Sequence, residues 1–164
     1  MSQIKYIGKK LYLEKSSIVN IIKKNKTPFY LYSSRQLREN YLSFFNIFKK
    51  VKSIICFAAK ANTNLSILKN LAKLGCGADV VSAGELLKAI KAGISPKKIV
   101  FSGVGKTSEE IKYAINKGVF LINAESKSEI EEIERIAKLK KRKIKIGIRL
   151  NPNTDAKTLS KIST

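Results

Sequence analysis

Histidine is absent from this chain of 164 residues, and so is tryptophan. Without histidine the chain cannot supply an imidazole for general acid–base catalysis, and most zinc sites are excluded within it. Its two cysteines, Cys56 and Cys76, have no neighbours at metal-ligand spacing. We therefore predict no metal site, and we expect a reducing, cytoplasmic environment.

Long apolar runs are missing as well. The longest, residues 54–59, has the length of a strand and falls far short of the roughly 20 apolar residues that a membrane-crossing helix needs. Residues 1–5 lack the apolar stretch of a secretory signal. We therefore expect no contact with a membrane.

Acidic residues are scarce: the chain has 12 of them and 33 basic residues, for a formal net charge of +21. One interpretation is nucleic-acid binding, since clustered cations neutralise phosphates. Only five basic residues are arginine, however, and many lysines fall at the polar positions of helical patterns, as do Lys69, Lys88 and Lys112. The dense basic run at 138–145 falls at an expected helix end, where cations complement the dipole. We favour a solvated surface and keep a nucleic-acid-binding module as the alternative.

Strand and helix patterns alternate along the chain from residue 29. The expected strands are 29–32, 53–59, 78–81, 99–101, 119–122 and 144–150, and a helical pattern follows each of the first five. The run at 53–59 is apolar throughout, which predicts a strand covered on both faces. The alternation predicts parallel strands in a doubly wound sheet or a (β/α)8 barrel. A barrel needs eight strands and about 250 residues, so this chain would supply about six of the eight βα units.

The ends of the helices are marked in the sequence. Gly75, Gly93 and Gly118 follow helical patterns and can end them in the left-handed conformation. Three helices are expected to begin with a capping box, formed by the pairs Ser82 and Glu85, Thr107 and Glu110, and Ser126 and Glu129.

Candidate site residues follow from the strand ends, because parallel α/β folds gather ligands at the carboxyl ends of their strands. Lys60 ends the second strand among small apolar residues, where desolvation would lower the pKa of its amine and make it a nucleophile. It is one of 28 lysines (33 basic residues less five arginines), so position alone makes it only a candidate. Asp79 lies inside a strand and needs a partner, for which Arg149 is available.

The loop at 102–107, Ser-Gly-Val-Gly-Lys-Thr, resembles a phosphate-binding loop but fails both common patterns. Val100 occupies the position of the first glycine of a Walker A loop, and Ser108 that of the third glycine of the dinucleotide pattern. A tight turn between strand and helix is the favoured interpretation, with a ligand-lining loop as the alternative.

Several motifs in one register resemble a known family. They are Phe-Ala-Ala-Lys-Ala-Asn at 57–62, Gly-Cys-Gly-Ala-Asp-Val-Val-Ser-Ala-Gly-Glu at 75–85 and Ile-Val-Phe-Ser-Gly-Val-Gly-Lys-Thr at 99–107, with flanking pieces at 27–33, 149–153 and 155–158. Together they are similar to diaminopimelate decarboxylases, which are pyridoxal-phosphate enzymes of fold type III. One departure is Leu159, where many members have histidine.

The resemblance implies a function and a division of the chain. Residues 1–26 would be an N-terminal segment belonging to the β domain of the full-length family, and 27–164 part of the cofactor-binding barrel. The reaction would convert meso-2,6-diaminopimelate to L-lysine in a cytoplasmic homodimer. Related decarboxylases of ornithine, arginine or carboxynorspermidine are the alternative.

The same resemblance assigns roles to three residues. Lys60 would hold pyridoxal phosphate covalently and act in catalysis, and Asp79 and Arg149 would bind the cofactor beside it. The family's ring-stacking histidine, glycine-rich phosphate loop, acidic residue at the ring nitrogen, partner-subunit cysteine segment and most of its β domain are not in this sequence. We therefore expect little turnover from these 164 residues alone.

Overall fold

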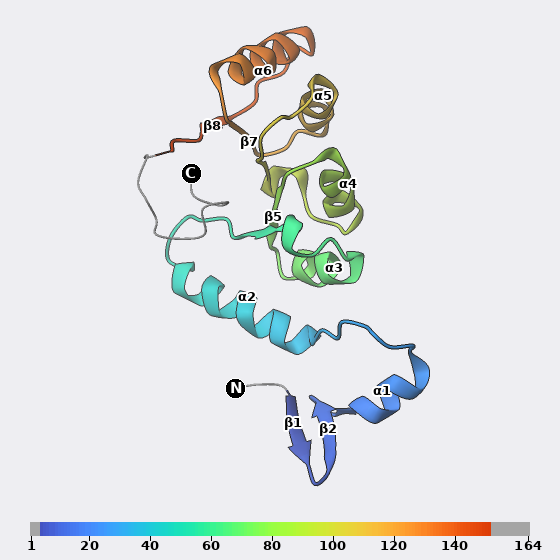
Figure 1. Cartoon of the computed structure of the whole chain (residues 1–164). Coiled ribbons are helices and arrows are strands. Elements are labelled where there is room, and N and C mark those ends of the chain that lie inside the picture. The colour runs from blue at the N-terminus through green and yellow to red at the C-terminus, as the bar shows by residue number, and fades with distance from the viewer. Residues whose placement is uncertain (1–3, 152–164) are drawn as a thin grey trace.

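A computed structural model describes residues 4–151 and begins with a small antiparallel sheet. Strands β1 (Ile4–Ile7), β2 (Lys10–Leu13) and β3 (Ser16–Ser17) pair in that order, and helix α1 (Ile18–Lys24) follows. Gly8 turns the first hairpin at a φ of 60°, which glycine adopts without steric cost. This sheet lies at one end of an elongated molecule (Figure 1).

The prediction of a strand at residues 29–32 is wrong. The segment has no regular structure, and Tyr30 is 90% exposed. A strand forms when a neighbour pairs with its backbone groups, and within residues 4–151 no strand lies in register with this segment. Helix α2 (Ser34–Phe48) follows, with Ser33 accepting a hydrogen bond from the Gln36 N–H at its start.

Five parallel strands, rather than six, form the main sheet of the described chain. They are β4 (Cys56–Ala58), β5 (Gly77–Val80), β6 (Ile99–Phe101), β7 (Leu121–Ala124) and β8 (Ile146–Ile148), and they lie side by side in chain order. The helices between them are α3 (Leu65–Lys73), α4 (Ala83–Lys91), α5 (Ser108–Lys117) and α6 (Lys127–Leu139). Two short 3-10 helices, η1 (Ala59–Ala61) and η2 (Pro96–Lys98), flank β4 and β6. A parallel α/β fold is therefore confirmed.

The expected helix ends are largely present. Gly118 ends α5 at a φ of 68°, and Thr107 and Glu110 form the reciprocal capping box at its start. At α4 and α6 the serine cap is present, but the glutamate accepts from the residue before the cap: Val81 N–H bonds Glu85 at 2.9 Å and Glu125 N–H bonds Glu129 at 2.7 Å. The fully extended caps, with φ near −155°, differ from Thr107 at −74° and bring the preceding N–H within reach.

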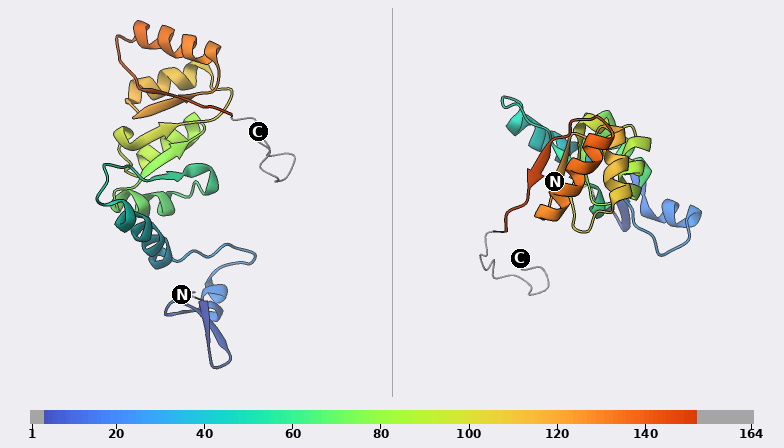
Figure 2. Two further views of the ribbon diagram at one scale, coloured as in Figure 1. Left: turned by 90° about the vertical axis from the view of Figure 1, so that its left-hand side faces the viewer. Right: turned by 90° about the horizontal axis from the view of Figure 1, so that it is seen from above.

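The core lies between one face of the sheet and helices α3 to α6, which stack in order along it (Figures 1 and 2). Side chains that alternate along each strand fill it: Ala78, Val80, Ile99, Phe101 and Ile122 are 0% exposed. The intervening residues point to the opposite face, which we call the inner face, and are only half-buried. The expectation that the strand at 53–59 is covered on both faces is thus wrong for β4, because no second layer covers the inner face within the described residues.

Phe101 is the largest of the fully buried side chains, so its truncation tests the core. We expect Phe101→Ala to lower the free energy of unfolding by about 3–5 kcal/mol, measured by urea denaturation. Phe48→Ala is the matched control, because Phe48 on α2 is 43% exposed. Equal losses for the two variants would contradict this assignment of the core.

Candidate functional site

Polar side chains collect where the inner face reaches the carboxyl edge of the sheet. Asp79 pairs with Val100 across β5 and β6, and Asn123 pairs with Gly147 across β7 and β8. Ser102 follows Val100 by two residues, so alternation places it on the same face. This edge therefore presents a carboxylate, a hydroxyl and an amide from three consecutive strands.

These three side chains form one hydrogen-bonded line, the Asp79–Ser102–Asn123 chain. The Asn123 amide Nδ2 donates to Ser102 Oγ at 3.0 Å, and Ser102 Oγ donates to Asp79 Oδ1 at 2.5 Å. No other hydrogen bond or ion pair joins the Asp79 carboxylate to residues 4–151. One carboxylate oxygen is therefore held while the other stays available. Sequence reasoning assigned no role to Ser102 or Asn123, whose only signals were their place at strand ends and, for Ser102, its place in the motif at 99–107.

Lys60 lies at the same edge, in the 3-10 turn that directly follows β4. Ala58, two residues before it, pairs with Asp79, while Ala59 is fully buried. Lys60 itself is exposed, and its amine has no hydrogen-bond or ion-pair partner among the described residues. The expected desolvation of this amine is therefore not seen, because β4 is an edge strand whose inner face is open.

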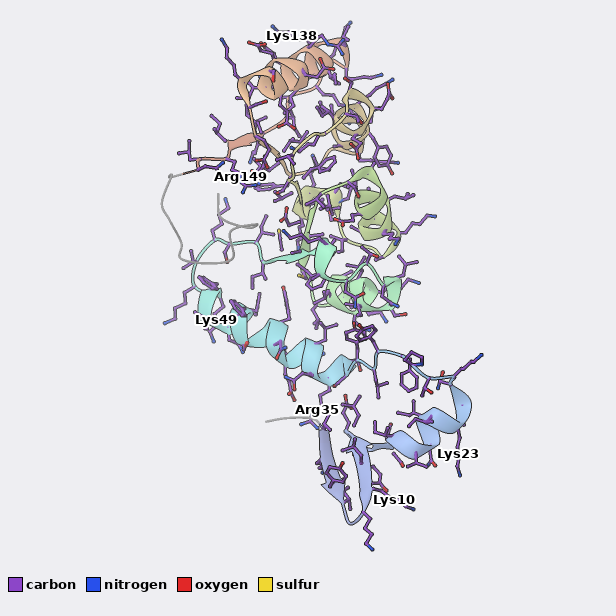
Figure 3. All side chains as sticks on the ribbon, in the orientation of Figure 1. Lys10, Lys23, Arg35, Lys49, Lys138 and Arg149 are labelled. Carbon is purple, nitrogen blue, oxygen red and sulfur yellow. The ribbon has the colours of Figure 1, made fainter. Side chains whose placement is uncertain are left out.

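Arg149 does not pair with Asp79, so that expected partnership is wrong. Its Nη1 lies 3.4 Å from Glu125 Oε2, and its Nε donates to Asn151 at 3.3 Å. Arg149 follows β8 and Asp79 lies on β5, three strands away, a separation of about 14 Å at the usual strand spacing. Arg149 nevertheless extends from the same edge (Figure 3). The motif at 155–158 and Leu159 lie outside the described residues.

Lys106 lies under this edge rather than in a ligand site. Its side chain is 1% exposed, and its Nζ donates to Glu129 Oε1 at 2.7 Å and to the carbonyls of Asn123 at 2.7 Å and Gly103 at 2.6 Å. An ammonium has three protons, and all three are used. The loop at 102–107 is therefore a structural turn whose lysine cannot serve as a phosphate ligand. Sequence reasoning missed this role because Glu129 looked only like a capping residue.

Glu110 joins two neighbouring βα units below the site. Its Oε1 accepts a hydrogen bond from the Ala83 N–H at 3.0 Å, and its Oε2 accepts one from the Thr107 N–H at 3.1 Å. These N–H groups hold the pKa of Glu110 below its ordinary value. Glu110 thus stays ionised at neutral pH and fixes the start of α4 against α5.

The thiols of Cys56 and Cys76 are poor nucleophiles. Burial raises the pKa of Cys76 to about 11, and burial followed by the charge of Asp79 raises the pKa of Cys56. Because the thiolate is the reactive form, neither cysteine competes with the Lys60 amine near neutral pH. The described residues also contain no group of three histidine, cysteine, aspartate or glutamate side chains able to hold a metal ion.

Lys60 and the half-held carboxylate of Asp79 lie at the carboxyl ends of neighbouring strands in a parallel α/β sheet, which is where proteins of this class bind their ligands. Comparison with known proteins gives the family. Residues 34–164 match the family described as "Pyridoxal-dependent decarboxylase, pyridoxal binding domain". The chain belongs to this family of pyridoxal-dependent decarboxylases, as the motifs around Lys60 indicated.

Named relatives make the comparison more specific. The chain is 53% identical over 139 residues to a diaminopimelate decarboxylase of Helicobacter pylori strain J99, covering 85% of the chain and 34% of that protein. The crystal structure of the H. pylori enzyme complexed with L-lysine matches 89% of the chain at 49% identity, with a TM-score of 0.85 and 37% of its own length covered. The crystal structure of a diaminopimelate decarboxylase from "m. jannaschi" matches 98% of the chain at 37% identity and a TM-score of 0.89, with 38% of its own length covered. The chain thus spans little more than a third of these relatives.

The donor set fits a pyridoxal cofactor. The group is attached through a lysine amine, and Lys60 supplies an amine with no described partner. Asp79 adds a carboxylate with one oxygen free, on the inner face that no second layer covers. Within residues 4–151 no helix has the length and apolarity needed to cross a membrane.

Removing the buried cation tests the role of Lys106. We expect Lys106→Met to lower the free energy of unfolding by about 3–5 kcal/mol, because Glu129 is left as an unpaired buried charge. The measurement is chemical denaturation. Lys138→Met is the matched control, since Lys138 forms an exposed pair with Glu134 and should cost less than about 1 kcal/mol.

A second variant separates lost charge pairing from lost packing. Adding Glu129→Gln to Lys106→Met should recover part of the stability, because glutamine carries no charge yet still accepts from the Glu125 N–H. Similar unfolding energies for Lys106→Met and Lys138→Met would contradict the buried pair.

Proposed function

We propose that this chain is the cofactor-binding part of a diaminopimelate decarboxylase, which converts meso-2,6-diaminopimelate to L-lysine and carbon dioxide. The observation that carries the proposal is the Lys60 amine, which has no partner among residues 4–151, at the strand edge that also presents Asp79. Relatives named diaminopimelate decarboxylase over 85% of the chain support this substrate, as does a related structure complexed with L-lysine.

Lys60 is the residue that would attach the cofactor through its amine and would be released when the amine of the substrate takes its place on the cofactor. Its exposure suits this exchange, because an incoming amine must reach the same atom. When bound, pyridoxal phosphate supplies an electron sink for the electrons left behind as carbon dioxide departs. The protein supplies the attachment, the orientation and the surrounding charge.

Asp79 and Arg149 would provide that charge from two strands of the same carboxyl edge, β5 and β8. Asp79 offers its free oxygen as a hydrogen-bond acceptor facing the inner side, and its other oxygen is held in place by Ser102. Arg149 is 45% exposed and held by Glu125, so its remaining donors can reach an anionic group of the cofactor or substrate.

The architecture proposed for the complete protein is a (β/α)8 barrel. Sequential strand order with the helices on one face supports it, because a doubly wound sheet changes strand order and carries helices on both faces. Residues 27–164 would form part of this barrel, and 1–26 would belong to the second, β-rich domain. We further propose a cytoplasmic homodimer, as the family resemblance implies.

The competing nucleic-acid module is less well supported. The labelled basic side chains are spread from the N-terminal hairpin to α6 rather than gathered on one element (Figure 3). Several are also tied to acidic neighbours, as in the pairs Arg35–Glu39 and Lys138–Glu134. A phosphate-binding surface instead needs free cations concentrated on one face.

Covalent trapping tests the assignment of Lys60. The chain is incubated with pyridoxal phosphate, reduced with borohydride, and its labelled peptides are quantified by mass spectrometry. We expect labelling of Lys60 to saturate at lower cofactor concentration than labelling of the other lysines, because this amine follows β4 at the edge that also presents Asp79. Lys60→Ala should abolish the preferred label, and Lys69→Ala, at an exposed lysine of α3, should leave it unchanged.

Uniform labelling of all lysines in the unaltered chain would contradict the proposal. Equal labelling patterns for Lys60→Ala and the unaltered chain would do the same. Decarboxylation by the isolated chain is expected to be slight, because the inner face remains open to water.

A further inference from the structure

We propose that Ser102 and Asn123 are positioning residues that fix the Asp79 carboxylate for the cofactor bound at Lys60. This inference rests on the function proposed above and extends it to two residues to which the family resemblance assigned no role. It is carried by the Asp79–Ser102–Asn123 chain, whose members come from β5, the loop after β6, and β7.

The direction of the chain is determined by its chemistry. The Asn123 amide nitrogen can only donate, so Ser102 Oγ must accept from it. The single hydroxyl proton of Ser102 is then left to form the hydrogen bond to Asp79 Oδ1, with an O···O distance of 2.5 Å. A charge-assisted bond of this length holds the carboxylate strongly.

Asn123 is itself fixed from two sides. Its backbone carbonyl accepts a hydrogen bond from the buried Lys106 Nζ at 2.7 Å. Its side-chain Oδ1 lies over Gly147, so close that a Cβ at that position would be 2.3 Å away. Only glycine at position 147 leaves the amide where it can donate to Ser102.

The arrangement leaves a function for Asp79 beyond linking strands. If the Asp79–Ser102–Asn123 chain only joined β5, β6 and β7, hydrogen bonds to both oxygens of the carboxylate would stabilise it more than a bond to one. Instead one oxygen is held and the other has no hydrogen bond or ion pair with residues 4–151. The free oxygen is on the inner face, where Lys60 would hold the cofactor.

The test measures the pyridoxal phosphate concentration that gives half-maximal borohydride-trapped labelling of Lys60. We expect Ser102→Ala to raise this concentration about tenfold, as loss of one hydrogen bond to a charged group predicts. Ser95→Ala is the matched control, because Ser95 is exposed and makes no side-chain cap bond. Ser102→Thr keeps the hydroxyl and should stay close to the unaltered chain.

A double-mutant cycle separates positioning from independent binding. If Ser102 acts through Asp79, then Ser102→Ala combined with Asp79→Ala should label no more weakly than Asp79→Ala alone. Gly147→Ala, which displaces the Asn123 amide, should weaken labelling as Asn123→Ala does.

Three results would overturn the inference. Labelling by Ser102→Ala could match the unaltered chain, the losses of the two single variants could add in the double variant, or the loss could merely follow a lower melting temperature shared with Ser102→Thr. Failure of the proposed function is distinguishable, because it appears in the unaltered chain as an absence of preferred Lys60 labelling, and the inference then falls with it.

Discussion

The buried ammonium of Lys106 is the interaction on which the site depends. It joins the turn after β6, the end of β7 and the start of α6 through Gly103, Asn123 and Glu129. These segments carry the side chains that hold Asp79. A buried cation with three good acceptors is costly to disturb, since removing any partner leaves an unsatisfied group in low dielectric.

The second constraint is the one-sided covering of the sheet. Helices α3 to α6 bury alternate strand residues such as Val80 and Phe101 and leave the inner face half-exposed. Polar groups can therefore stay on that face without a large desolvation cost. The same openness explains why the Lys60 amine is exposed and free. In a protein that completes the barrel, this face would become its interior, where desolvation could then act on Lys60.

Much of the fold was predictable from the sequence beyond residue 50. Strands and helices there lie within about three residues of the expected positions, because hydrophobic period and caps act locally. The strand expected at 29–32 failed for the opposite reason: pairing is not local, and no neighbour was available. The capping boxes predicted at Ser82 and Ser126 are only half formed. The backbone conformation of each serine lets the glutamate accept from the N–H of the residue before the cap instead of the N–H of the cap itself.

The sequence by itself determined the parallel α/β class, the family and the candidates Lys60, Asp79 and Arg149, since motif order and strand ends are written in the chain. Only the tertiary structure decided their partners. In the structure Asp79 accepts a hydrogen bond from Ser102, and Arg149 pairs with Glu125. Lys106, expected in a loop, forms a buried ion pair with Glu129. Hydrogen-bond partners depend on strand register and side-chain direction in space, and residues 20 or more apart in sequence meet only once the sheet has formed.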